Sequence, residues 1–206
     1  MNIDIAEGQH IVVLGQTGSG KTFYLKNALL KTVRRVLIID TEEKEFNDYA
    51  LAKGNPSHIV RSIPKPKEKN FRWRAVPPVA GQDEYIDELC NELLDAPNAE
   101  HSWIVFEEVT DYSDAFTIPD GMRSLVRKAR KRKITVACTS QRPAGINKWL
   151  YENSQHKFLF YTDPDEQSRM KRLTPVTALA LAQIKYGSHD FIYVGPGGQP
   201  VLCKHI

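Results

Sequence analysis

The chain has 206 residues, of which 41% are hydrophobic and 26% charged, so it has the composition of a globular protein and enough length to bury one sizeable core. Its formal charge of +3 is too small to indicate a nucleic-acid partner, and only local clusters of cations can support one. Three dispersed cysteines and six histidines without metal-ligand spacing argue against a disulfide framework and a zinc module. The short acidic N-terminus argues against a signal peptide. The sequence lacks an apolar run of roughly 18 residues, which argues against a transmembrane segment.

The first half of the chain alternates Val- and Ile-rich runs with a stretch of helical periodicity. HIVVLG at 10–15 predicts a strand and TFYLKNALLKT at 22–32 a helix. RVLIID at 35–40 predicts a second strand and SHIVRS at 57–62 a short third one. A long loop rich in Pro and Lys should follow at 63–81, around the short extended piece FRWRAV.

The second half continues the alternation. A helix is predicted at about 82–95 from apolar residues at helical spacing, followed by the strand WIVFEEV at 103–109. A basic helix at 121–132 should lead into the strand KITVACTS at 133–140. The last predicted elements are a strand at 157–162, one or two helices between 164 and 185, and a hairpin of 190–195 and 200–204 around GPGGQ.

Strands that alternate with helices indicate a mainly parallel central sheet flanked by helices on both faces. The terminal hairpin should add antiparallel edge strands to that sheet. No repeat, low-complexity tract or interdomain linker interrupts the pattern. We therefore expect one α/β domain over residues 1–206, and the glycine-rich motif at 15–22 predicts that it is of the P-loop NTPase type.

GQTGSGKT at 15–22 is a complete G-x-x-x-x-G-K-[ST] motif, also called Walker A, between a predicted strand and a predicted helix. The glycines let backbone N–H groups turn toward phosphate oxygens, and Lys21 should reach the β- and γ-phosphates of ATP. The hydroxyl of Thr22 should bind Mg²⁺. The residues predicted to hold the nucleotide are Gly15, Gln16, Thr17, Gly18, Ser19, Gly20, Lys21 and Thr22.

Two adjacent glutamates end the predicted strand WIVFEEV. Side chains alternate along a strand, so Glu107 and Glu108 can face the same way only if the strand has ended there. We assign Glu107 to the Mg²⁺ shell, directly or through water, and Glu108 to activation of the attacking water. A second carboxylate indicates hydrolysis, because a small-molecule kinase uses the hydroxyl of its second substrate.

The stretch KARKRKITVACTSQRP at 128–143 joins a cationic run to an apolar strand. Ligands of a doubly wound sheet bind beyond the carboxyl ends of its strands. Gln141 should therefore lie near the γ-phosphate, beside the acidic pair, as a polar sensor.

Together these motifs resemble those of the FtsK–HerA superfamily of DNA-pumping ATPases. The similarity rests on the P-loop, the strand ending in adjacent acidic residues, Ser140-Gln141-Arg142-Pro143 at the end of a later strand, and VLIIDTEEKEF. It covers roughly residues 8–200, and the small size most resembles the genome-packaging ATPases of icosahedral double-stranded-DNA viruses with internal membranes, such as archaeal turreted viruses.

The resemblance implies a homo-oligomeric ring, expected to be a hexamer, that threads double-stranded DNA without reading its sequence. Hydrolysis would occur between subunits, and an arginine of the neighbour would stabilise the transition state. By its spacing to the glutamine that arginine is Arg130, with Arg127 or Arg123 as the fallback. A capsid or viral internal-membrane protein would be a further partner, and the place of action would be the host cytoplasm or the virion vertex.

Two basic stretches are candidates for DNA contact, since phosphate binding needs clustered cations. One is RSLVRKARKRK at 123–133, some of whose cations could instead meet nucleotide across a subunit boundary. The other runs from Lys65 to Arg74 and includes Phe71 and Trp73. A solvated cationic face is the alternative for both.

Three other functions stay open from the sequence. A P-loop small-molecule kinase has this size but no use for the glutamate pair. A regulatory GTPase usually carries N-K-x-D, whereas Asn147-Lys148-Trp149-Leu150 has Leu at the last place. A cellular motor of the same superfamily would share all of these motifs.

Overall fold

The computed structural model describes residues 3–43, 45–67, 70–170, 173 and 179–204. The strands are β1 (Ile11–Leu14), β2 (Arg35–Ile39), β3 (Ala50–Leu51), β4 (Phe71–Ala75), β5 (Trp103–Phe106), β6 (Thr135–Ser140), β7 (His156–Phe160), β8 (Phe191–Val194) and β9 (Pro200–Cys203). The α-helices are α1 (Lys21–Tyr24), α2 (Pro56–Ser62), α3 (Gln82–Asp95), α4 (Asp120–Lys128), α5 (Lys148–Asn153) and α6 (Pro164–Met170). Shorter helical turns are η1 (Leu25–Leu29), η2 (Pro97–Ala99), η3 (Val109–Asp111), η4 (Ala129–Arg132) and η5 (Pro143–Gly145).

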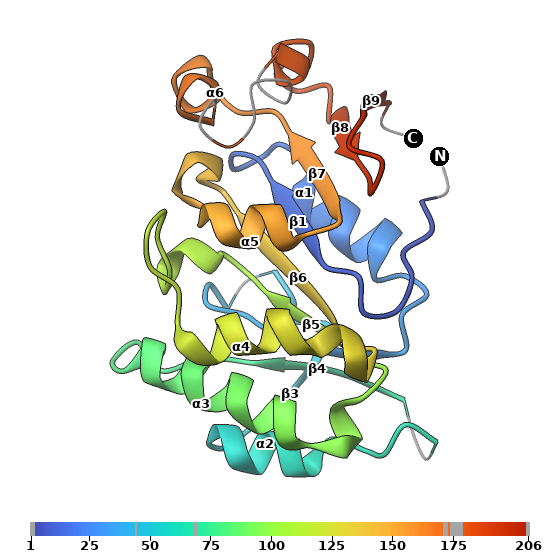
Figure 1. The fold of residues 1–206 in the computed structure, drawn as a ribbon, viewed down its shortest axis with the longest axis vertical. Helices are drawn as coiled ribbons and strands as arrows, with labels where there is room; N and C mark the ends of the chain where they lie inside the picture. The colour runs from blue at the N-terminus through green and yellow to red at the C-terminus, as the bar shows by residue number, and fades with distance from the viewer. Residues whose placement is uncertain (1–2, 44, 68–69, 171–172, 174–178, 205–206) are drawn as a thin grey trace.

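These strands form one sheet in the order β3-β4-β2-β5-β6-β1-β7-β8-β9 (Figure 1). Every pair from β3 to β7 is parallel, whereas β8 and β9 add to β7 as antiparallel strands. The predicted α/β class, the mainly parallel sheet and the terminal antiparallel hairpin are confirmed.

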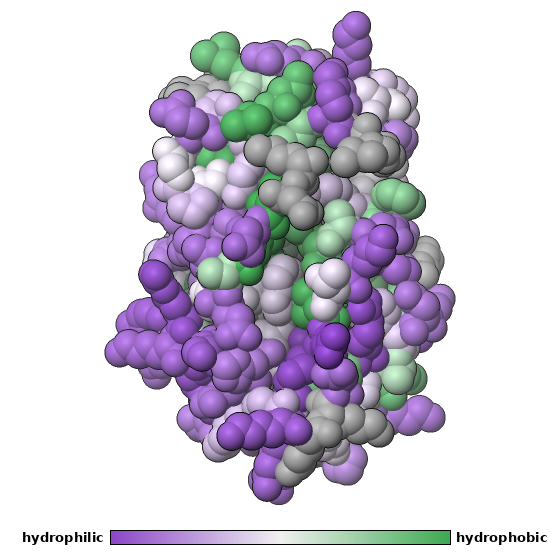
Figure 2. All heavy atoms as spheres, turned by 90° about the vertical axis from the view of Figure 1, so that its right-hand side faces the viewer, coloured by the Kyte–Doolittle hydropathy of each residue, from purple (hydrophilic) through white to green (hydrophobic). Residues whose placement is uncertain are grey.

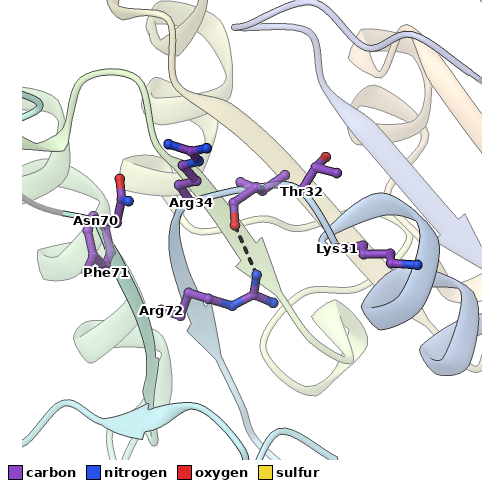
Figure 3. A pocket seen from close by; sticks show the side chains of 7 residues that line it. Lys31, Thr32, Arg34, Asn70, Phe71 and Arg72 are labelled. Atoms are coloured by element: carbon purple, nitrogen blue, oxygen red, sulfur yellow. Dashed lines mark hydrogen bonds between the residues drawn. The ribbon is translucent and has the colours of Figure 1, made fainter.

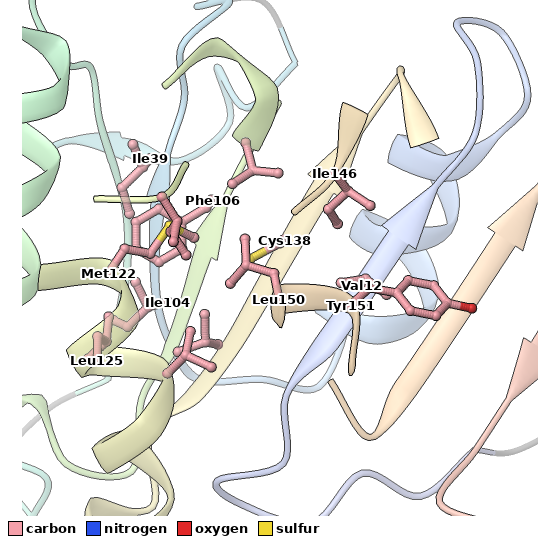
Figure 4. Packing of buried hydrophobic residues seen from close by; sticks show 14 of the residues in the cluster. Val12, Ile39, Ile104, Phe106, Met122, Leu125, Cys138, Ile146, Leu150 and Tyr151 are labelled. Atoms are coloured by element: carbon pink, nitrogen blue, oxygen red, sulfur yellow. The ribbon is translucent and has the colours of Figure 1, made fainter. Parts of the chain in front are cut away.

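The sheet separates two layers of apolar packing. On β1, Val12 and Leu14 belong to one buried cluster and Ile11 and Val13 to the other, as the alternation of side chains along a strand requires. Helices α2 to α5 cover the first face, and α1 with η1 covers the second (Figure 1). Figure 4 shows how the first face packs, with side chains of β5 against those of α4. The side chains on both faces of the central strands are therefore buried.

One predicted strand is wrong. Residues 57–62 lie in the helix α2, which begins after Asn55 with Pro56 at its first position. The side chain of Asn55 accepts a hydrogen bond from the backbone N–H of His58 at 2.9 Å, which is the usual N-cap contact. Apolar Ile59 and Val60 are buried on the core side of this helix. In the sequence these neighbouring apolar residues looked like a short buried strand, because so short a run does not distinguish a strand from a helix.

Smaller differences concern the ends of elements. The predicted basic helix is divided into α4 and the tighter turn η4, and a short strand β3 was not predicted. The helix α6 confirms a helix after residue 164, and part of the stretch up to 185 lies outside the described residues. Among the described helices none is long and apolar enough to cross a membrane.

The two ends of the parallel strands make two edges of the molecule. The carboxyl edge carries the segments that follow β1, β2, β5 and β6, and the amino edge carries those that precede them. Helices return from the carboxyl to the amino edge, so α3 and α4 begin at the former and end at the latter (Figure 1). This polarity decides which predicted site residues can meet within one chain.

Candidate nucleotide site

The P-loop, residues 15–22, connects β1 to α1 at the carboxyl edge. Its first two backbone N–H groups donate to the neighbouring segments, Gly15 to Ser140 O at 3.1 Å and Gln16 to Tyr161 O at 3.0 Å. Gly18 and Gly20 have φ values of 77° and 95°, in the left-handed region that favours glycine. These bonds anchor the loop on both adjoining strands, and a third bond, from the Ser19 N–H to Gln16 O at 3.2 Å, closes a turn within it.

Two glycines of the loop leave no room for a side chain. A Cβ on Gly15 would lie 2.6 Å from the Cβ of Phe160, and one on Gly20 would lie 2.8 Å from the imidazole Nδ1 of His189. Both distances are shorter than real Cβ contacts. The glycine spacing of the motif therefore reflects close packing at these two positions as well as backbone conformation.

Lys21 is buried, with 7% of its surface exposed, and burial lowers the pKa of its ammonium group. The carboxylates of Glu108, Glu107 and Glu42 oppose that shift. The hydroxyl of Ser19 is also buried and has no hydrogen-bond partner among the described residues. A cation and an unpaired hydroxyl beneath a glycine loop fit a polyphosphate group, which supplies oxygens for both.

Glu107 and Glu108 follow the end of β5 and differ in backbone conformation. Glu107 still bonds across the sheet, its N–H donating to Ile39 O at 3.0 Å. Glu108 has φ 40° and ψ 61°, a left-handed conformation that a non-glycine residue adopts at a cost of about 1–2 kcal/mol. The strand has thus ended at the second glutamate, which allows both carboxyl groups to serve one site.

The carboxylate of Glu108 is held by three donors. It accepts from the backbone N–H of Gln141 at 2.8 Å, from the Ser140 hydroxyl at 3.2 Å and from the Thr110 hydroxyl. The Thr139 hydroxyl in turn accepts from the Glu108 N–H at 3.1 Å. These bonds stabilise the left-handed backbone and fix the carboxylate, which is 6% exposed, at the end of β6.

Glu107 lies in a more acidic environment. Burial, the charge of Asp40 and a hydrogen bond to Asp40 raise the pKa of Glu107 to about 9, with Glu42 and Glu45 adding to the shift. Asp40 is fully buried and pairs with Arg74 at 3.3 Å. One carboxyl oxygen of Glu107, Oε2, has no hydrogen-bond partner among the described residues. Carboxyl oxygens such as this one, and hydroxyl oxygens such as that of half-buried Thr22, are ligands of the kind that Mg²⁺ prefers.

Gln141 connects the P-loop to the acidic residues. Its side-chain oxygen accepts a hydrogen bond from the Thr17 hydroxyl, and its side-chain nitrogen donates to Glu42 at 2.9 Å. Thus the structure brings together the P-loop, Glu107, Glu108 and Gln141, as the sequence predicted, at one edge of the sheet.

Several residues of the site were missed by sequence reasoning. Thr110 and Ser140 hold the Glu108 carboxylate, Asp40 contacts Glu107, and Glu42 binds Gln141. The signal for Asp40 and Glu42 was available, because Asp40 ends a predicted strand and Glu42 follows shortly after, at the same edge of the sheet. Thr110 carries no comparable signal.

Two of the three candidate arginines lie at the edge opposite this site within one chain. Arg130 and Arg127 are exposed near the amino edge, and a Cβ on Gly8 would lie 3.0 Å from the Arg130 backbone. Arg123 stacks over Trp149, with its guanidinium 5.1 Å from the ring centroid. Arg130 and Arg127 can meet a nucleotide only if that nucleotide belongs to a second copy.

The basic stretch from Lys65 to Arg74 offers less to DNA than its sequence indicated. Arg72 donates to the backbone carbonyls of Leu30 and Val33, both at 3.1 Å, and Figure 3 shows the bond to Val33. The guanidinium of Arg72 also lies over the ring of Tyr49. Arg74 is the partner of Asp40. Both arginines hold the fold together, and Lys69 lies outside the described residues.

Comparisons with known proteins agree with this fold. The genome packaging NTPase B204 from Sulfolobus turreted icosahedral virus 2, in complex with ATP-gammaS, has 16% identity and a TM-score of 0.79, over 98% of this chain and 100% of that one. B204 from Sulfolobus turreted icosahedral virus, described as a DNA-packaging ATPase, has 16% identity and a TM-score of 0.73, over 98% and 100%. VirB4 of Thermoanaerobacter pseudethanolicus has 14% identity and a TM-score of 0.67, over 96% and 89%.

At these identities the likeness establishes a shared fold, and it confirms the structural resemblance to P-loop ATPases of the FtsK–HerA type. No protein-family model matches the sequence, and no curated protein does.

Proposed function

We propose that this chain is a Mg²⁺-dependent ATPase that translocates double-stranded DNA, and that it packages a viral genome into a preformed capsid. The observation that carries the proposal is the contact of the P-loop Thr17 with Gln141, whose own N–H holds the carboxylate of Glu108. This arrangement joins a phosphate-binding loop to a base for water. The similarity to B204, a genome packaging NTPase solved with ATP-gammaS and with AMPPCP, favours DNA as the object that is moved.

The P-loop would bind the triphosphate of ATP. Its central N–H groups and the Ser19 hydroxyl would donate to phosphate oxygens, and Lys21 would neutralise charge on the β- and γ-phosphates. Thr22 and Glu107 would hold Mg²⁺, which when bound offsets the negative charge that builds up on the transferred phosphoryl group.

Glu108 would act as the base for hydrolysis. Its carboxylate takes a proton from the attacking water as the water oxygen bonds to the γ-phosphorus and the bond to the β–γ bridging oxygen breaks, giving ADP and phosphate. The side chain of Gln141 would exchange its contacts with Thr17 and Glu42 for the γ-phosphate. The conformation at the end of β6 would thereby depend on whether the γ-phosphate is present.

Stabilisation of the transition state calls for a further cation besides Lys21. Arg130 of a neighbouring copy would supply it, with Arg127 or Arg123 as the fallback, and such arginines accelerate phosphoryl transfer by about 10³–10⁵-fold. This requirement is the reason to propose a homo-oligomeric ring, of six subunits by the resemblance stated above. A capsid or internal-membrane protein would anchor the ring at the virion vertex in the host cytoplasm.

Displacement of a third DNA strand from duplex DNA tests translocation directly. We expect the chain to release a labelled triplex-forming strand only with ATP and Mg²⁺, and Lys21→Ala to abolish release. Lys53→Ala, at an exposed lysine remote from the P-loop in sequence, is the matched control and should behave as wild type. Release that continues in Lys21→Ala, or that does not require ATP, would contradict the proposal.

A further inference from the structure

A groove of about 580 Å³ lies beside the first turns of α3 and α4, at the carboxyl edge. Five carboxylates line it, those of Asp83, Glu84, Asp87, Glu88 and Asp120, and we call it the acidic groove. The helix dipole accounts for acids in the first turn of each helix, and the Asp87 carboxylate accepts a hydrogen bond from the N–H of Gly121 in the first turn of α4, whereas Glu88 lies in the second turn of α3. In the described part of the chain, no ion pair involves any of the five.

Tyr112 also lines the acidic groove. It is 5% exposed, and its hydroxyl finds no hydrogen-bond partner among the residues that the structure describes. Buried tyrosine hydroxyls normally have a partner. The Tyr112 hydroxyl is therefore a buried polar group that the described part of the chain leaves unsatisfied behind the groove.

Next to the groove, Phe116 is 84% exposed on a firmly built turn. The Asp114 carboxylate accepts from the N–H groups of Phe116 at 2.6 Å and Thr117 at 2.7 Å, and Asn147 donates to the Asp114 carbonyl at 3.2 Å. A phenylalanine held rigidly in water is unfavourable unless another surface covers it. The turn therefore presents an apolar anchor beside a row of carboxylates.

The opposite edge carries the complementary charge. Arg127, Lys128, Arg130, Lys131 and Lys133 are exposed at the end of α4 and in and after η4, and we call them the basic run. None of them has an ion pair among the described residues, whereas Arg132 pairs with Glu100. Figure 2 views the side of the molecule toward which α4 ends, and hydrophilic side chains cover much of it.

One chain cannot pair these two surfaces with each other. Helix α4 begins at Asp120 in the acidic groove and ends at Lys128 in the basic run, and its 9 residues span about 13 Å. That distance is beyond the reach of a salt bridge between the helix ends, and Lys131 lies further on. The charges of each surface must meet something else.

We propose that the acidic groove and Phe116 bind the basic run of a second copy of this chain. This inference rests on the ATPase ring proposed above and names the surfaces that would join its subunits. Such a contact is head-to-tail, because it uses different surfaces of the two copies, and repetition of it closes a ring when the rotation between neighbouring copies is a whole fraction of a turn. It brings the neighbour's Arg130 to the carboxyl edge, where the P-loop lies. DNA is a poor occupant of the groove, since its phosphates would meet five carboxylates.

Charge reversal with rescue tests the contact in the full-length chain. Sedimentation velocity with ATP-gammaS, Mg²⁺ and duplex DNA gives the dissociation constant for self-association. We expect Glu84→Lys and Lys131→Glu each to raise it at least tenfold, Phe116→Ser to raise it about tenfold, and the Glu84→Lys/Lys131→Glu double variant to recover most of the loss. Lys53→Glu, an equal charge change elsewhere on the surface, should leave it within twofold of wild type. Added salt should weaken the wild-type contact.

Affinity for a labelled ATP analogue shows that each variant has folded with an intact nucleotide site. Wild-type chain that stays monomeric, reversals that leave association within twofold, or a double variant no better than either single one would each overturn the interface. If such variants still hydrolyse ATP and translocate DNA as wild type does, the interface is wrong and the proposed function stands. If association follows the charges but no ATP is hydrolysed, the function is wrong and the interface stands.

Discussion

Replacement of Glu108 by glutamine tests the site at its most constrained side chain. The carboxylate accepts from the Gln141 N–H at 2.8 Å, the Ser140 hydroxyl at 3.2 Å and the Thr110 hydroxyl. Glutamine has one accepting oxygen and one donating nitrogen, so at least one of these buried donors loses its partner. The loss should lower the free energy of unfolding by about 1–3 kcal/mol, or roughly 2–4 °C in Tm for each kcal/mol.

The effect on turnover should be far larger than the effect on stability. Without a base for water, steady-state phosphate release should fall by about 10²–10⁴-fold, while affinity for a labelled ATP analogue stays within a few-fold of wild type. Glu152→Gln, at an exposed glutamate of α5, is the matched control and should change neither quantity. Turnover of Glu108→Gln within threefold of wild type, in folded protein that binds nucleotide, would refute the role of Glu108 as base.

Three further predictions follow from particular contacts. Arg74→Met should lower the free energy of unfolding by about 3–5 kcal/mol, because it removes the cation that pairs with the buried carboxylate of Asp40, and urea unfolding measures the loss. His10 is buried between Val126 O and the Val136 N–H, and burial lowers its imidazole pKa. The unfolded chain then binds the proton more readily, so acidification below pH 6.5 should destabilise the fold by at most about 1.4 kcal/mol per pH unit, with a smaller slope in His10→Asn. Arg130→Ala should bind ATP normally yet turn over slowly, and when mixed into wild type it should inhibit more than in proportion to its share; strictly additive loss would count against an arginine supplied by a neighbour.

The P-loop, the acidic strand end and Gln141 could be found from sequence because each has a local pattern. A glycine octet between a strand and a helix, or polar residues at the end of an apolar run, predicts its own place at the carboxyl edge. The structure adds the contact that joins them, since Thr17 meets Gln141 only when β1 and β6 are neighbours.

Other features depend on partners distant in sequence. The left-handed backbone of Glu108 is stabilised by hydroxyls of β6 and by the N–H of the residue after it, about thirty residues later in the chain, which no local pattern reveals. Arg74 looked like a surface cation because its partner Asp40 comes from another strand. The helix α2 is different, because Asn55 and Pro56 signalled a helix start that the apolar run outweighed in the prediction.

The most direct test of the central claim is the rate of ATP hydrolysis with and without duplex DNA, measured together with the mass of the protein in solution. The proposed motor predicts hydrolysis that requires Mg²⁺, a rate that rises several-fold when DNA longer than the ring is added, and a mass of several subunits under the same conditions. A monomer whose rate is the same with and without DNA would contradict it.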